Sequence, residues 1–260
     1  MKRKVIYYTD ELNDEFSEAQ ITARKIDGKY RYEPGISGHI GRGVIYYGIM
    51  RQVAWLYMKA VYGHRIVNKK VLRKYRHTGY FLYGNHTNPV ADAFIPSLLS
   101  FPKGAYIIVH PNNVSMPVLG HLTPCMGALP LPDTMDAMRH FTKRIENVIK
   151  AGKCVTIYPE AHIWPYYTDI RPFKKDSFGY PIGLKTPVFA FTNTYRKRPF
   201  RRTPGMVTYI EGPFFPDESL PSGERKQELR DRVYAAMKAD TVHSNIEVIK
   251  YIKKEDTGES

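Results

Sequence analysis

Two side chains able to perform acid–base chemistry, His86 and Asp92, lie close together after a short apolar run. The run from Tyr80 to Tyr83 predicts a buried strand, and Asn88-Pro89 predicts a helix with Asn88 as its cap and Pro89 at the first helical position. We therefore expect His86 on a strand-to-helix turn, with Asp92 about one helical turn further on, where its carboxylate can orient the imidazole. The pair alone leaves another interpretation open, in which a loop histidine stands beside a solvated aspartate.

A second apolar run, Cys154 to Tyr158, predicts another buried strand that delivers polar side chains at its carboxyl end. Glu160 and His162 are those side chains. The chain continues with the segment Pro-Phe-Lys-Lys-Asp-Ser-Phe over residues 172–178 and with a further apolar strand over residues 187–193. Short apolar strands that alternate with helices predict an α/β fold with active groups at the strand ends.

Together with the Asn85-His86 turn, these landmarks resemble, in order and separation, the motifs of the glycerophosphate and lysophospholipid acyltransferase family over roughly residues 64–215. The departures concern the spacing and the acceptor. Five residues, where the family has four, separate His86 from Asp92. The family's Gly-Thr-Arg is replaced by Ala161-His162-Ile163, which removes its phosphate-binding arginine, and Asp176 replaces a glycine.

The resemblance implies transfer of a fatty acyl group from an acyl thioester to a hydroxyl of a lysophospholipid or glycerol-phosphate acceptor. A hydroxyl needs a base because its pKa lies far above neutrality, and His86 is the natural base, with Asp92 holding the imidazole tautomer. The sequence has no Gly-x-Ser-x-Gly motif, so we expect direct attack on the thioester. The expected substrate-binding residues surround the two strand ends and include basic residues that would replace the missing arginine: Asn85, Glu160, His162, Arg171, Lys174 and Lys175.

The residues do not distinguish acyl-CoA from acyl-carrier protein as the donor. No bound cofactor is expected. No metal is expected either, because His121 and Cys125 have no matching second pair of ligands. Only two cysteines and no secretory signal indicate a reducing, cytoplasmic compartment.

The formal net charge of +14 predicts an anionic partner: a membrane surface, an acyl-carrier protein or a nucleic acid. Residues 44–62 form one apolar and aromatic run that is interrupted by Arg51 and Lys59. This pattern favours a helix lying among lipid headgroups, although a buried helix packed on the sheet is the alternative. A basic cluster over residues 65–76 follows and would attract anionic lipids. No apolar run is long enough to cross a bilayer, so we expect peripheral or monotopic attachment at the cytoplasmic face of the membrane.

The predicted organisation is an extended, poorly packed arm over residues 1–38, a membrane-associating helical element over 39–76, an acyltransferase domain over 77–243 and a frayed tail over 244–260. By resemblance, the fold is a mixed sheet wrapped by helices and preceded by a membrane-docking helix, as in glycerol-3-phosphate acyltransferases. The alternative function is a non-catalytic, lipid-binding relative that has lost its acceptor site. A nucleic-acid-binding module is less expected because the basic residues are spread over several loops.

Overall fold

The structure is a computed structural model that describes residues 4–16, 22–33, 35–117 and 119–254. Its centre is a seven-stranded sheet in the order β2-β8-β7-β3-β6-β4-β5. Neighbouring strands are parallel except for the antiparallel pair β7 and β8. The strands are β2 (Arg65–Val67), β3 (Tyr80–Gly84), β4 (Ala105–Val109), β5 (Ala128–Pro130), β6 (Cys154–Ile157), β7 (Val188–Arg196) and β8 (Gly205–Phe214). The mixed α/β sheet expected from the sequence is confirmed.

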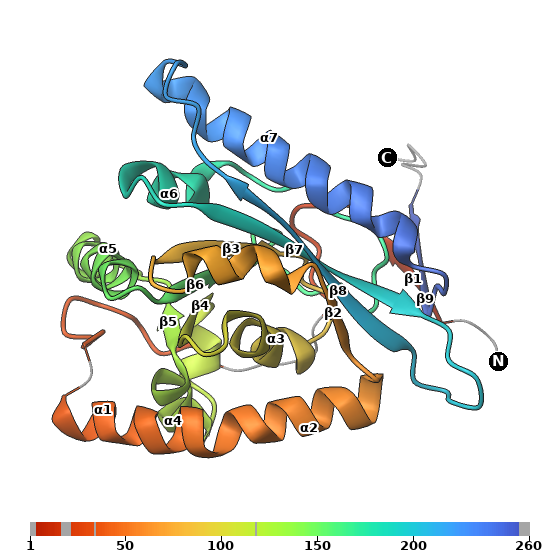
Figure 1. Ribbon diagram of the computed structural model, residues 1–260, viewed down its shortest axis with the longest axis horizontal. Coiled ribbons are helices and arrows are strands. Elements are labelled where there is room, and N and C mark those ends of the chain that lie inside the picture. Colours follow the sequence, from red (N-terminus) through yellow and green to blue (C-terminus); the bar gives the residue numbers. More distant parts are fainter. Residues whose placement is uncertain (1–3, 17–21, 34, 118, 255–260) are drawn as a thin grey trace, which may run out of the picture.

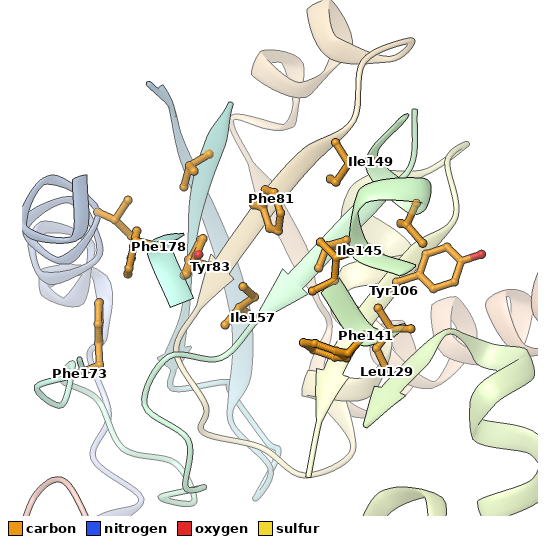
Figure 2. Close-up of a cluster of buried hydrophobic side chains, with 14 of the residues drawn as sticks. Phe81, Tyr83, Tyr106, Leu129, Phe141, Ile145, Ile149, Ile157, Phe173 and Phe178 are labelled. Carbon is orange, nitrogen blue, oxygen red and sulfur yellow. The ribbon is translucent and has the colours of Figure 1, made fainter. Parts of the chain in front are cut away.

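Helices cover both faces of this sheet, so its central strands are buried on both sides. Figure 1 shows α7 (Ser222–Asp240) on one side, and α3 (Ala91–Ser100) and α2 (Arg51–Tyr62) on the other. Alternate residues of β3 serve the two faces. Phe81 and Tyr83 join the core with α7 and with α5 (Met135–Lys150), as seen in Figure 2, whereas Tyr80 and Leu82 join the core with α2 and α3.

Shorter helical segments complete the fold in the described residues. They are α4 (Leu119–Met126), α6 (Gly179–Gly183) and the 3₁₀ segments η2 (Lys69–Tyr75), η3 (Pro111–Val114), η4 (Asp176–Phe178) and η5 (Thr241–His243).

The helix expected over residues 44–62 is longer than predicted. It runs without a break through α1 (Ile36–Gly41), the π-helical segment η1 (Arg42–Met50) and α2, and forms a rod along the outside of α3 and α4 (Figure 1). The buried guanidinium of Arg42 ties the rod to the domain by donating to the backbone oxygens of Cys125 at 3.1 Å and Ala105 at 2.9 Å. Among the described residues, no helix combines the length and the apolar character needed to cross a membrane.

The part of the rod's surface that does not pack on the domain exposes apolar side chains. We call these residues the apolar stripe: Ile40, Val44, Ile49, Val53, Trp55 and Leu56. The opposite surface is buried through Ala54, Met58 and Tyr62, which recur at the helical spacing that places them on one face. The rod is therefore amphipathic and is not the fully buried helix that was the alternative.

The two ends of the described chain are better ordered than expected. β1 (Lys4–Tyr8) pairs in parallel with β9 (Ile249–Lys253). Further along, Ile26 is fully buried and the Tyr32 hydroxyl donates to the Pro130 oxygen at 2.9 Å. The expectations of a poorly packed arm and a frayed tail are thus wrong for these residues. Residues 1–3, 17–21, 34 and 255–260 of the same segments lie outside the described residues.

Polar side chains cap the starts of two helices that flank the sheet. The regular part of α3 begins at Ala91, two residues after the expected start at Pro89, but Asn88 makes the predicted capping bonds. Its Oδ1 accepts from the Ala91 N–H at 3.0 Å and its backbone oxygen accepts from the Asp92 N–H at 2.9 Å. α5 is capped by Thr134, whose hydroxyl accepts from the Ala137 N–H. The neighbouring Asp133 carboxylate does not cap the helix and accepts from the Ile26 N–H at 2.7 Å.

Candidate active site

His86 and Asp92 meet at the carboxyl end of β3. The His86 Nδ1 lies 2.8 Å from the Asp92 Oδ2, and the side chains are 19% and 1% exposed, respectively. The same oxygen accepts from the N–H groups of Thr87 and Asn88, each at 2.9 Å. A carboxylate only accepts hydrogen bonds, so Nδ1 carries the shared proton and Nε2 keeps its lone pair. The five-residue spacing is compatible with the pair because the turn before α3 folds two backbone N–H groups onto the carboxylate.

The His86 ring is held from the next strand. The Tyr158 ring stacks on it with centroids 4.5 Å apart and planes 17° apart. The Tyr158 hydroxyl donates to the backbone oxygen of Asp92 at 2.5 Å. Burial raises the pKa of Tyr158 well above its ordinary value, so the hydroxyl stays protonated and keeps donating. One residue thus fixes the plane of the imidazole and the start of α3.

A chain of buried polar side chains leads away from Asp92 through the sheet. The Asn193 amide nitrogen lies 3.4 Å from Asp92 Oδ1, and Asn193 Oδ1 accepts from the Thr208 hydroxyl at 2.7 Å. The Thr208 oxygen lies 2.8 Å from the His64 Nε2. Burial, together with Lys59 and Lys69, lowers the pKa of His64 to about 4, so the ring is neutral and donates to Thr208. We call Asp92, Asn193, Thr208 and His64 the buried polar chain.

Asn85 belongs to the same network and not to an open substrate surface. It is 1% exposed. Its side-chain nitrogen donates to the backbone oxygen of Asn193 at 3.0 Å, and its Oδ1 accepts from the backbone N–H of Asn193 at 2.8 Å. Asn85 therefore joins the end of β3 to β7 and positions His86. This corrects the expectation that it binds substrate.

Glu160 and Arg171 form a buried pair next to His86. The Glu160 carboxylate accepts from the backbone N–H of His86 at 3.0 Å and of Arg171 at 3.1 Å. The Arg171 Nη2 lies 3.6 Å from Glu160 Oε2, and both side chains are inaccessible. Burial raises the pKa of Glu160, and the charge of Arg171 and the two N–H groups partly offset this.

Arg171 is 1% exposed and its guanidinium is enclosed by the protein, although its Nε has no partner among the described residues. It donates to the backbone oxygens of Glu160 and Glu11, each at 3.2 Å, and to that of His162, and it lies 4.9 Å from the Trp164 ring centroid. The expectation that Arg171 and Glu160 contact the acceptor is therefore wrong. The pair fixes the loop after β6 and, through Glu160, the backbone of His86.

That loop is clamped by both ends of the described chain. The Trp164 ring stacks on Tyr251 of β9 at 4.9 Å, and its Nε1 donates to the Asp14 oxygen at 2.8 Å. The Trp164 N–H in turn donates to the His86 backbone oxygen at 3.2 Å. The β1–β9 pair thus supports the site through one tryptophan.

The other expected binding residues reach solvent. The His162 ring is 33% exposed and its Nδ1 lies 3.5 Å from Glu15. Lys174 and Lys175 are exposed. They follow Phe173, whose oxygen accepts from Arg230 of α7, so they lie on the face of the sheet opposite to α3. The structure does not bring the two lysines beside His86.

Cys154 does not offer a nucleophile. It is fully buried at the start of β6, and burial raises the pKa of its thiol to about 12. Within the described residues, no group of three metal-ligating side chains gathers. His121 lies outside the residues whose side chains are described.

The residues that the sequence did not single out are Asn193, Thr208, His64 and Tyr158. The first three lie on strands or loops far along the chain from Asp92. Tyr158 ends the predicted strand two residues before Glu160. An aromatic residue at the end of that strand was the feature of the sequence that could have indicated a contact with His86.

The His86 Nε2 has no hydrogen-bond partner among the described residues, and a carboxylate orients the ring at the carboxyl edge of a mainly parallel sheet. This arrangement defines an α/β protein equipped for general acid–base chemistry. Residues 63–192 match the family model described as Acyltransferase, and the chain belongs to this acyltransferase family. The family expected from the sequence is confirmed.

Among solved structures, the chain is similar to the 1-acyl-sn-glycerophosphate (LPA) acyltransferase PlsC from Thermotoga maritima. The TM-score is 0.57 and the identity 15%, over 79% of this chain and 83% of that chain. The likeness confirms the expected fold. No curated protein matches the sequence significantly.

Proposed function

We propose that the protein transfers a fatty acyl group from an acyl thioester, acyl-CoA or acyl-carrier protein, to a hydroxyl of a lysophospholipid or glycerol-phosphate acceptor at a membrane surface. The observation that carries this proposal is the 2.8 Å bond between His86 Nδ1 and Asp92, in a chain of the acyltransferase family. It leaves Nε2 as the basic nitrogen of a partly exposed ring.

The reaction follows from these two residues. Nε2 of His86 takes the proton of the acceptor hydroxyl while the oxygen attacks the thioester carbonyl carbon. The tetrahedral intermediate then collapses, the carbon–sulfur bond breaks, and the thiolate receives the same proton from the imidazolium. Asp92 stabilises the imidazolium through Nδ1 and does not take its proton. The products are the acylated acceptor and the free thiol.

The membrane part of the proposal rests on the rod. The apolar stripe comprises six exposed apolar side chains of the rod, and the chain carries a net charge of +14. A helix of this kind binds the headgroup region with its apolar side inward, and its charge favours anionic lipids. We therefore place the protein at the cytoplasmic face of the membrane as a peripheral or monotopic protein, with anionic lipids as partners and acyl-carrier protein as a second candidate.

The test measures labelled acyl transfer from acyl-CoA and from acyl-carrier protein to glycerol 3-phosphate, lysophosphatidic acid and phosphate-free lysolipids. His86→Ala is the control, and we expect it to abolish turnover while its unfolding temperature and liposome binding stay near those of the wild type. Turnover retained by His86→Ala contradicts the mechanism. If the wild type yields no product from any pair but still binds liposomes, the non-catalytic lipid-binding function replaces the proposed one.

A further inference from the structure

A pocket of about 670 Å³ opens beside the rod, and His86 is not among its lining residues. α2 forms one wall, and β2, η2, α3 and the adjoining residues His64 and Phe101 contribute the rest. Three of its lining residues are the cations Arg51, Lys59 and Lys69, and its apolar floor includes Met58 and Leu98. The described residues that line it include no carboxylate.

These cations are gathered without opposite charge. Burial lowers the pKa of Lys69, and the charges of Arg51 and Arg73 lower it further. Burial likewise lowers the pKa of Arg51. The charged neighbours that act on Lys69 are thus cations. Their mutual repulsion in a partly buried site costs free energy, and a bound anion would offset that cost.

The groups present unused hydrogen-bonding capacity. The Arg51 guanidinium stacks over Phe101, with Cζ 3.2 Å from the ring centroid, and its buried Nε has no partner among the described residues. Lys59 and Lys69 each give one hydrogen bond to a backbone oxygen, of His64 and Leu98, at 2.6 Å. An ammonium has three donors, so each retains two.

The position of the pocket on α2 indicates where the anion comes from. Arg51, Trp55 and Lys59 are spaced four residues apart, so they form one line along the helix. At 100° per residue, Arg51 falls on the buried surface of α2, between Met58 and Tyr62. Trp55 and Lys59 fall between this buried surface and Leu56 of the apolar stripe. If the apolar stripe lies in a bilayer, the cationic pocket lies at the depth of the lipid phosphates.

We infer that this pocket is a binding site for the phosphate of an anionic phospholipid, held by Arg51 and Lys69 with Lys59 at the rim and Trp55 against the lipid. The inference rests on the membrane-surface part of the proposed function and not on acyl transfer. It goes beyond adsorption by net charge, because a built pocket gives selectivity and saturation that a diffuse basic surface does not.

The experiment compares two pairs of substitutions that remove the same charge. Arg51→Gln/Lys69→Gln, the pocket pair, removes two of the cations that line the pocket. Lys70→Gln/Lys74→Gln, the control pair, removes two exposed cations of η2 that do not line it. Sedimentation with phosphatidylcholine vesicles, with and without phosphatidic acid, measures binding in the absence of donor. We expect the pocket pair to bind the anionic vesicles about tenfold more weakly than the control pair, with little difference on phosphatidylcholine alone.

Equal losses of binding to anionic vesicles in the two pairs contradict the proposed phosphate site, because diffuse charge then accounts for the binding. Circular dichroism and thermal unfolding test the fold of each pair. Arg51→Gln alone serves as a second variant, since it leaves the Lys69 bond to Leu98 in place.

Calorimetry with short-chain phosphatidic acid below its micelle concentration, with coenzyme A and with inorganic phosphate identifies the source of the anion. Saturable binding of phosphatidic acid to the wild type and to the control pair, and its loss in the pocket pair, supports the inference. Binding of coenzyme A or phosphate alone, lost in the pocket pair, overturns the assignment to lipid. Sedimentation does not require turnover, so an inactive protein that shows this selectivity refutes acyl transfer and not the pocket.

Discussion

Replacement of Asp92 by asparagine tests the mechanism most directly, because it keeps the shape of the side chain and removes its charge. In the structure, Asp92 Oδ2 accepts hydrogen bonds from His86 Nδ1 at 2.8 Å and from the backbone N–H groups of Thr87 and Asn88. The amide oxygen can keep accepting from all three, so the turn before α3 should survive. What is lost is the attraction between the carboxylate and the imidazolium that forms during the reaction.

The size of that loss follows from the geometry. With charge centres about 4 Å apart and an effective dielectric constant of about 20, the interaction is about 4 kcal/mol. Since each 1.36 kcal/mol is a factor of ten in rate, kcat should fall by about a thousandfold. The stability cost should be smaller, about 1–3 kcal/mol, because the new amide nitrogen faces the donor nitrogen of Asn193.

The assay measures kcat and KM for Asp92→Asn with the preferred donor and acceptor, and free energies of unfolding by urea. Asp240→Asn is the matched control, a buried aspartate outside the site that should leave kcat unchanged. A kcat within tenfold of the wild type, in a folded Asp92→Asn protein, refutes the stabilisation of an imidazolium by Asp92. A loss confined to KM refutes it as well.

Three other predictions concern residues around the pair. Arg171→Met should cost about 3–5 kcal/mol of unfolding free energy, because it leaves Glu160 buried without its countercharge. The ratio of KM values between phosphate and phosphate-free acceptors should not change. A selective rise in KM for phosphate acceptors would show that Arg171 contacts them. Tyr158→Phe keeps the ring on His86 and loses one hydrogen bond, so kcat should fall less than about tenfold, and a larger fall would mean that the hydroxyl takes part in the reaction. The pKa of His64 is lowered to about 4, so its contribution to stability is present above its unfolded pKa and is lost as the pH falls toward the folded pKa. Between about pH 7.5 and about pH 5 this contribution should fall by about 2 kcal/mol in urea unfolding, and an equal pH dependence in His64→Gln would contradict it.

The His86–Asp92 pair could be predicted because both residues lie within one strand-to-helix turn, where local spacing sets the geometry. Asn193, Thr208 and His64 could not, since their contact with the pair depends on the pairing of β7 with β3 and β8. Local sequence does not record such pairing. The strands themselves were readable because buried parallel strands are continuous apolar runs.

The errors have physical causes too. A charged side chain does not reveal whether it is buried, and the Arg171 guanidinium is enclosed by backbone oxygens from separate segments that the sequence does not connect. The rod begins earlier than predicted. Gly38, Gly41 and Gly43 are poor helix formers, so the sequence did not indicate a helix there. Packing, including the hydrogen bonds of the buried Arg42, overrides that preference. The arm was misjudged because its partner, β9, stands at the other end of the described chain.

The clamp on Trp164 also sets an order of events during synthesis. The sheet and the helix α7, which buries one of its faces, are complete once Asp240 has been added, but the loop that supports His86 is held by Tyr251 of β9. The 13 residues from 241 to 253 take roughly 1–3 s to add at about 5–20 residues per second. During that interval the nascent chain has its core and its histidine but not the contacts that hold the loop beside it. The site therefore matures after the fold does, and a chain arrested in this interval should be folded but poorly active.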